Sequence, residues 1–260
     1  GASDAANVDT VIATASGALG AAIGVVTNII TTDHSTGVVV TGTSTDKSSL
    51  TGTSVSVDAD AKEGISSLLI AASGAQYAAV SASVNVNRQL SDVSAAVDQT
   101  EVLGSFAQNA NYLGRITTSA ITAAGSQYAA VPISVVINYA DNAVSSSVAH
   151  SILRAEGQSA SVGANRISEF SSLNVTASGA MYGAVAGLVN VNTIEGATSA
   201  EVNDSEVKAG QFSVNAENED HLKVTDVTAT GAIGSLGASV VVSYFKGSSA
   251  ANLRNSIVTA

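Results

Sequence analysis

The stretch Val-Thr-Ala-Ser-Gly-Ala-Met-Tyr-Gly-Ala-Val-Ala-Gly-Leu-Val-Asn-Val-Asn, residues 175–192, decides the fold, because related segments recur along the whole chain. Internal repetition at a fixed period is typical of proteins that stack one structural unit. Five segments align on one glycine, spaced by 57, 51, 54 and 52 residues, or 53.5 on average. These anchor glycines are Gly17, Gly74, Gly125, Gly179 and Gly231.

Apolar residues alternate around each anchor with the period of a β-strand. Four residues before an anchor stand Ile70, Ile121, Val175 and Val227, which we expect to face inward. After the anchor, alternating Val and Asn at 84–87 and 189–192 predict a second strand, and Val55-Ser56-Val57 and Phe212-Ser213-Val214 predict a third. A shared Val lies 23 residues past the anchors as Val97, Val148 and Val202, but Leu253 lies 22 past, which indicates one deletion in the last repeat.

Three strand-bearing stretches in about 53 residues predict coils of about 18 residues, although two coils of about 27 residues per repeat stay possible. The predicted fold class is all-β, a right-handed parallel β-helix (β-solenoid) with about five imperfect repeats of roughly 53 residues. About fourteen such coils, stacked at about 4.8 Å, would form a rod of roughly 65 Å. We expect no helices, because no capped helical period is present.

The composition predicts a thin core. The 260 residues include six Tyr, four Phe, one Met and no Trp, whereas β-branched Val and Ile favour strands. Ala and Gly near each anchor suggest a narrow interior where backbones approach closely. Residues 41–49 form a polar insertion that we expect to protrude as a loop. No linker interrupts the register, so residues 1–260 are predicted to be a single continuous segment, a fragment of a longer repeat array.

The charge and residue counts exclude several classes of partner. A net charge of −11 disfavours nucleic acid and anionic lipid, because both require a basic surface. No apolar run reaches the roughly 20 residues of a membrane span. The absence of cysteine is compatible with export in an unfolded state.

The repeated amino-acid sequence resembles that of a known family. Residues 175–192, followed by Ser-Ala-Glu-Val-Asn-Asp-Ser-Glu-Val at 199–207, are similar to the repeats of leukotoxin-type filamentous adhesins, which are haemagglutinin-like β-helical proteins of Gram-negative bacteria. The resemblance implies a secreted or cell-surface virulence protein. It also implies type V export through an outer-membrane β-barrel transporter, attachment to host cells, and no catalytic residues.

Residues capable of chemistry do not form a recurring motif. His34, His150 and His221 fall at different repeat positions, and we expect them to be solvated. The carboxylates of Asp58 with Asp60, and of Glu217 with Glu219 and Asp220, are expected in solvated turns. Neither a catalytic site, a cofactor nor a structural metal is predicted. Recurring asparagines predict a structural role at corners; they are Asn28, Asn85 and Asn190, and Asn87, Asn138 and Asn192.

Tyr77, Tyr128 and Tyr182 share one repeat position and are the candidate lateral binding face. With three coils between them they would lie about 14 Å apart and could not touch. The alternative is that each Tyr merely covers an Ala/Gly-rich strand. The expected function is a structural or adhesive rod that attaches to a host protein or glycan receptor and is not an enzyme. The alternatives are a polysaccharide-degrading β-helix enzyme and a cytotoxic fragment.

Overall fold

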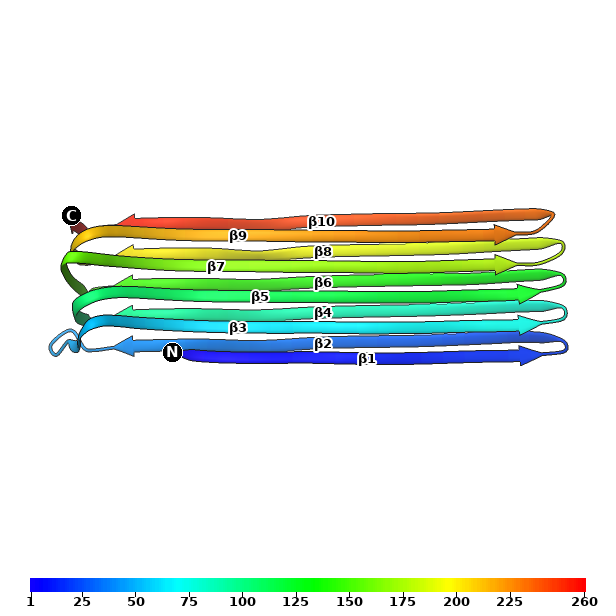
Figure 1. Cartoon of the computed structure of the whole chain (residues 1–260), viewed down its shortest axis with the longest axis horizontal. Coiled ribbons are helices and arrows are strands. Elements are labelled where there is room, and N and C mark those ends of the chain that lie inside the picture. The colour runs from blue at the N-terminus through cyan, green and yellow to red at the C-terminus, as the bar shows by residue number, and fades with distance from the viewer.

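The computed structural model describes residues 1–260 as two parallel β-sheets without a helix, and strands account for 90% of the chain (Figure 1). This confirms the all-β prediction. The six-stranded sheet contains β1 (Ala2–Ala18), β3 (Ser48–Ala75), β5 (Thr100–Ser126), β7 (Ile152–Gly179), β9 (Glu206–Gly231) and β11 (Ile257–Thr259). The five-stranded sheet contains β2 (Ala21–Thr41), β4 (Ala78–Asp98), β6 (Ala129–Ala149), β8 (Gly183–Asn203) and β10 (Gly234–Arg254).

Each repeat makes one circuit, which consists of one strand in each sheet. Consecutive strands run in opposite directions and alternate between the sheets, so every sheet is parallel (Figure 1). The anchor glycines pair directly across the six-stranded sheet, Gly17 with Gly74 and so on to Gly231. The predicted coils of 18 or 27 residues are therefore wrong. The short stretches taken as separate strands are parts of continuous strands of up to 28 residues.

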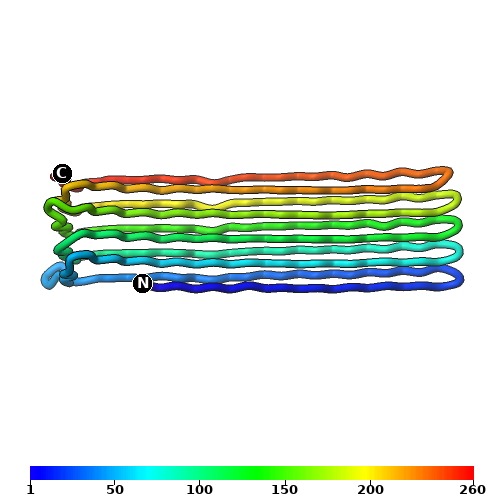
Figure 2. The backbone as a smooth tube through the Cα atoms, viewed as in Figure 1, coloured from blue at the N-terminus to red at the C-terminus, as the bar shows by residue number.

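The molecule is accordingly a flat slab and not the predicted rod of fourteen coils. Strands of 21 to 28 residues are about 70–90 Å long at about 3.3 Å per residue, whereas five stacked strands span only about 24 Å. The chain turns sharply at one end of the slab and follows wider curves at the other (Figure 2), although most connections at that end are only one or two residues long. Residues 42–47 form one of these connections, so the loop predicted at 41–49 is confirmed for its central part, whereas Thr41 ends β2 and Ser48 and Ser49 begin β3.

The deletion predicted in the last repeat is confirmed and located. Leu253 pairs with Val202, and Gly234 pairs with Gly183, so β8 and β10 are in register throughout. The chain from Gly179 to Gly183 is one residue longer than the chain from Gly231 to Gly234. The missing residue therefore lies in the sharp turn.

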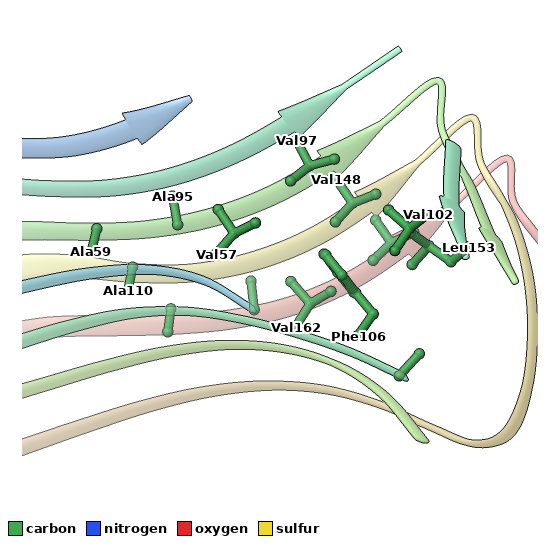
Figure 3. Packing of buried hydrophobic residues seen from close by; sticks show 14 of the residues in the cluster. Val57, Ala59, Ala95, Val97, Val102, Phe106, Ala110, Val148, Leu153 and Val162 are labelled. Carbon is green, nitrogen blue, oxygen red and sulfur yellow. The ribbon is translucent and has the colours of Figure 1, made fainter. Parts of the chain in front are cut away.

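The main hydrophobic core lies between the sheets in the half that is distant from the sharp turns. Figure 3 shows Val57, Val97, Val148, Phe106 and Leu153 packed against one another in this half. Near the sharp turns the interior is different, because Ser and Asn side chains replace aliphatic ones. Small apolar clusters around Ile116 and Leu69 separate these polar side chains.

The predicted facing of the strand residues before each anchor is wrong. Ile121 and Val227 point outward and are exposed, whereas the neighbouring Thr122 is buried between the sheets. Alternation with a period of two identifies two faces, but it does not tell which face is inside when the interior is polar.

The anchor glycines do not occupy a narrow interior. Gly74, Gly125 and Gly179 are exposed at the ends of their strands. A Cβ atom on Gly74, Gly179 or Gly231 would meet no atom within 4 Å, and none of the anchor glycines has a positive φ. Neither space nor backbone conformation requires glycine at these positions.

Candidate functional site

The three predicted tyrosines form a stacked ladder at the sharp turns. Tyr77, Tyr128 and Tyr182 each precede the first residue of a strand in the five-stranded sheet. The ring centroids of Tyr77 and Tyr128 lie 5.5 Å apart, and those of Tyr128 and Tyr182 lie 5.4 Å apart, with interplanar angles of 15° and 16°. The backbone fixes this spacing, since the Ala129 N–H donates to the Tyr77 carbonyl and the Gly183 N–H donates to the Tyr128 carbonyl. We call these three residues the tyrosine edge.

The expected 14 Å separation is wrong, because one circuit and not three separates successive tyrosines. The three tyrosine residues are between 48% and 55% exposed. Stacking covers part of the ring faces inside the ladder, so the exposed part of each side chain must lie mainly at the ring edge. The tyrosine edge can therefore offer a partner a row of phenol edges and hydroxyls.

The surroundings of the tyrosine edge are partly apolar. Leu19, Met181 and Ile233 lie in the same row of turns and are all exposed, and so are Gln76 and Gln127. A shallow hollow lies beside them on the outer side of the six-stranded sheet, between the ends of β5, β7 and β9. Small residues line it, including Ala123, Gly125, Ala177, Gly179, Ala229 and Gly231.

The outer side of the five-stranded sheet carries a second apolar surface, which the sequence reasoning missed. Ile29 is 69% exposed, Leu236 is 64% exposed, and Ile133 in the central strand is 45% exposed. We call this surface the aliphatic face. Its four rows across the strands are Ile23, Val80, Val131, Val185 and Leu236; Val25, Ala82, Ile133, Gly187 and Ala238; Thr27, Val84, Val135, Val189 and Val240; and Ile29, Val86, Ile137, Val191 and Val242.

Charged residues begin only beyond the aliphatic face. The next outward row contains Arg88, whose guanidinium lies 5.6 Å from the ring centroid of Tyr139. The row after it contains Asp33, Asp141, Glu195 and Lys246. Loss of solvation and the nearby Asp141 carboxylate raise the pKa of Tyr139. The aliphatic face is thus bounded by a polar rim.

Behind the aliphatic face the interior is polar. Asn87 donates to the side-chain oxygen of Asn138 at 2.9 Å, and Asn138 donates to that of Asn192 at 2.9 Å. Asn28 likewise donates to Asn85 at 3.2 Å. The predicted corner positions are wrong, since these side chains are buried in mid-strand. Identical amides that stack on neighbouring parallel strands can bond to one another, so asparagine suits a strand here.

The acidic pairs lie in strands and not in the expected turns. Asp58 and Asp60 belong to β3, where they accept hydrogen bonds from Asn109 at 2.9 Å and Asn111 at 2.8 Å. Asp220 belongs to β9 and pairs at 3.0 Å with Arg166, whose side chain is fully buried. Sequence reasoning does not identify Arg166 as the partner, because it lies one repeat away from Asp220.

The histidines lie at three separate places. His150 and His221 are exposed, and they contact Asp98 at 2.9 Å and Glu219 at 2.8 Å. His34 lies 3.6 Å from Glu63, which is buried between the sheets. Burial raises the pKa of Glu63, and a hydrogen bond from Ser91 lowers it by a smaller amount.

Comparisons with known protein families, with curated proteins and with solved structures find no match for this chain. No helix is present that is long and apolar enough to cross a membrane. The tyrosine edge and the aliphatic face are therefore interpreted from their own geometry.

Proposed function

We propose that this chain is a structural and adhesive segment of a secreted bacterial surface adhesin, and that the tyrosine edge contacts a host glycan or protein. The observation that carries the proposal is the exposed Tyr77–Tyr128–Tyr182 ladder, with centroids 5.5 and 5.4 Å apart, on a slab whose repeats otherwise present small or aliphatic residues there. Rigid amphipathic aromatics provide contact area at a low cost in side-chain entropy. The resemblance of residues 175–192 to filamentous adhesin repeats supports the same function.

The fold is proposed to be a flattened right-handed β-solenoid. Strands of one sheet that are consecutive in space, such as β3 and β5, are parallel and are connected through a strand of the other sheet. Connections between parallel strands of one sheet are right-handed in nearly all proteins, because of the right-handed twist of strands. In such a segment each repeat stacks on its neighbour, so the segment suits a role as a spacer.

The ligand is proposed to be an extended polymer that runs across the strands. The tyrosines repeat along the stacking direction, so a glycan or peptide chain lying in that direction would meet all three phenol edges. The hollow lined by Ala and Gly lies at the ends of β5 and β7, three residues before Tyr128 and Tyr182 in the chain, and offers room for groups of the same polymer. Hydroxyl groups on the tyrosines can donate to and accept from sugar hydroxyls or peptide carbonyls.

A structural role rather than catalysis is supported by how the charged side chains are used. Asp58 and Asp60 accept hydrogen bonds from asparagines of the neighbouring strand, and Arg166 pairs with Asp220. Arg115 similarly pairs with Glu169 at 2.6 Å across β5 and β7. These interactions connect successive circuits and stabilise the stack.

The test is attachment by the purified chain to arrays of glycans and host surface proteins. The variant Tyr77→Ser/Tyr128→Ser/Tyr182→Ser should lose binding while it keeps a β-sheet circular dichroism spectrum. The control replaces three outward residues at the distant end of the strands, Ser94→Ala/Ser145→Ala/Ser199→Ala, and should bind like the unmodified chain. Undiminished binding by the tyrosine variant would remove the tyrosine edge as the contact, and no binding by the unmodified chain would leave only the spacer role.

A further inference from the structure

The aliphatic face combines outward aliphatic residues with a polar interior directly beneath them. In β4, Val84 and Val86 point outward, whereas Asn85, which lies between them, and Asn87, which follows Val86, are fully buried. In β6, Ile137 points outward and Asn138 is buried. This is the reverse of the distribution that a solvated sheet normally has. The outward residues are therefore not needed to fill the interior of their own chain.

The size of the aliphatic face can be obtained from strand geometry. Four alternate positions along a strand cover about 25 Å, and five strands cover about 24 Å, so the face measures roughly 600 Å². The largest apolar patch on a monomeric protein is about 300–600 Å² and often marks an interaction site. Two such faces in contact would bury about 1,200 Å² in total, which is enough for a specific protein–protein interface.

We propose that two copies of this chain pair through their aliphatic faces, sheet against sheet. Two sheets that pack face to face lie about 10 Å apart, with their side chains interdigitated. A second copy supplies a surface of the same size, flatness and apolar character, and a two-fold axis makes one patch its own partner. Pairing is independent of whether the tyrosine edge binds a ligand.

The charge of the chain favours a second copy over lipid, because a net charge of −11 opposes adsorption to anionic lipid.

The outer side of the other sheet provides a matched control. Ile133 in β6 lies inside the aliphatic face and is 45% exposed. Ile121 in β5 is an outward isoleucine on the six-stranded sheet and is 38% exposed. Ser119 and Thr117 accompany Ile121 on the outer side of β5, so its surface is interrupted by polar groups.

The test compares Ile133→Lys with Ile121→Lys by sedimentation equilibrium. The unmodified chain of 25.6 kDa should sediment as a dimer. Ile133→Lys should raise the dissociation constant at least about a hundredfold, because two ammonium groups enter the apolar interface of each dimer. Ile121→Lys should dimerise like the unmodified chain. A monomer at concentrations up to about 100 µM, or equal dissociation constants for both variants, would overturn the proposal.

A second measurement covers the case in which Ile133→Lys does not fold. The chain contains no cysteine, so Val135→Cys provides one spin-label site at the centre of the aliphatic face. Double electron–electron resonance should give an intermolecular distance of roughly 10–20 Å, because the two sheets lie about 10 Å apart. Ser119→Cys, on the other sheet, should give a distance at least about twice as long.

A short distance for Ser119→Cys with none for Val135→Cys would contradict pairing through this face. A mean distance that shortens only in the presence of lipid vesicles would identify lipid as the occupant instead.

Discussion

Tyr77 and Tyr128 occupy the same position in successive repeats, and their rings stack with centroids 5.5 Å apart at an interplanar angle of 15°. This contact exists because one repeat completes one circuit of the two sheets. Equivalent residues are therefore neighbours, and any side chain that recurs in the repeat becomes a ladder. The same relationship produces the interior asparagine ladder and the rows of the aliphatic face.

The tyrosine ladder should stabilise the sharp turns. Tyr128→Ser removes stacking on both Tyr77 and Tyr182 and is expected to lower the free energy of unfolding by about 1–2 kcal/mol. Tyr128→Phe keeps the ring and should change the free energy of unfolding by less than about 0.5 kcal/mol. Urea denaturation measures both values. Equal losses of unfolding free energy for Tyr128→Ser and Tyr128→Phe would show that the hydroxyl group, and not ring stacking, stabilises the turns.

The asparagine ladder should contribute more per residue, because it is buried. Asn138 accepts hydrogen bonds from Asn87 at 2.9 Å and Thr118 at 2.8 Å, and it donates to Asn192 at 2.9 Å. Asn138→Ala removes all three bonds; Asn87 still donates to Thr118, but the Thr118 hydroxyl loses its acceptor and the Asn192 side-chain oxygen loses its donor. The variant is expected to cost about 3 kcal/mol of unfolding free energy in a urea titration. The outward Ser145→Ala should cost less than about 0.5 kcal/mol. Similar losses for the two variants would be inconsistent with a buried amide ladder.

Two glycines with contrasting surroundings should differ in their response to alanine. Gly104 has a φ of 118°, and a Cβ atom there would overlap the Gly52 carbonyl oxygen. Gly104→Ala should therefore lower the melting temperature markedly, at a cost of at least about 2 kcal/mol. A Cβ atom on Gly179 would meet no atom within 4 Å. The free energy of unfolding of Gly179→Ala should therefore be within about 0.5 kcal/mol of that of the unmodified chain. A larger loss of stability for Gly179→Ala than for Gly104→Ala would contradict the backbone geometry described at these two glycines.

Glu63 should make stability depend on pH. Burial raises its pKa in the folded state above the usual value near 4.5, with the Asp4 carboxylate adding to the increase and Ser91 and His34 opposing it. Because the folded-state pKa is raised, protonated Glu63 makes its full contribution to the free energy of unfolding below pH 4.5. This contribution is lost as pH rises through the folded-state pKa. Glu63→Gln should therefore unfold at higher urea than the unmodified chain at pH 8. The difference should vanish near pH 4, and a variant that is weaker at pH 8 would refute this assignment.

The sequence predicted the repeat, the strand class and the deletion near Leu253, because these depend only on residue spacing. It did not predict the length of a circuit. Long strands with polar interiors contain Ser and Asn at positions where shorter strands would have turns, and Asn favours turns in most proteins. The stretch Val84-Asn85-Val86-Asn87 shows the difficulty, since the pattern is that of a strand whichever face is inside.

Sequence spacing identifies which tyrosines share a repeat position, but it does not predict their arrangement. Tyr77, Tyr128 and Tyr182 recur at one position, and that recurrence does not depend on coil size. Their stacking and the aliphatic face depend on which residues are adjacent across strands, which requires the circuit length. Arg166 and Asp220 illustrate the same point, because a pair on neighbouring strands is separated by a whole repeat in the sequence.

Disulfide formation between neighbouring strands tests most directly the claim that one repeat is one circuit. Ser66 and Thr117 face outward and pair across β3 and β5, so cysteines placed there lie about 4.8 Å apart, within the range of a disulfide. Ser66→Cys/Thr117→Cys should form an intramolecular disulfide under mild oxidation, as detected by mass spectrometry of peptides. Ser66→Cys/Ser171→Cys, separated by two strand spacings, should not. If three coils separated equivalent residues, neither pair would form the disulfide, and that result would contradict the structure described here.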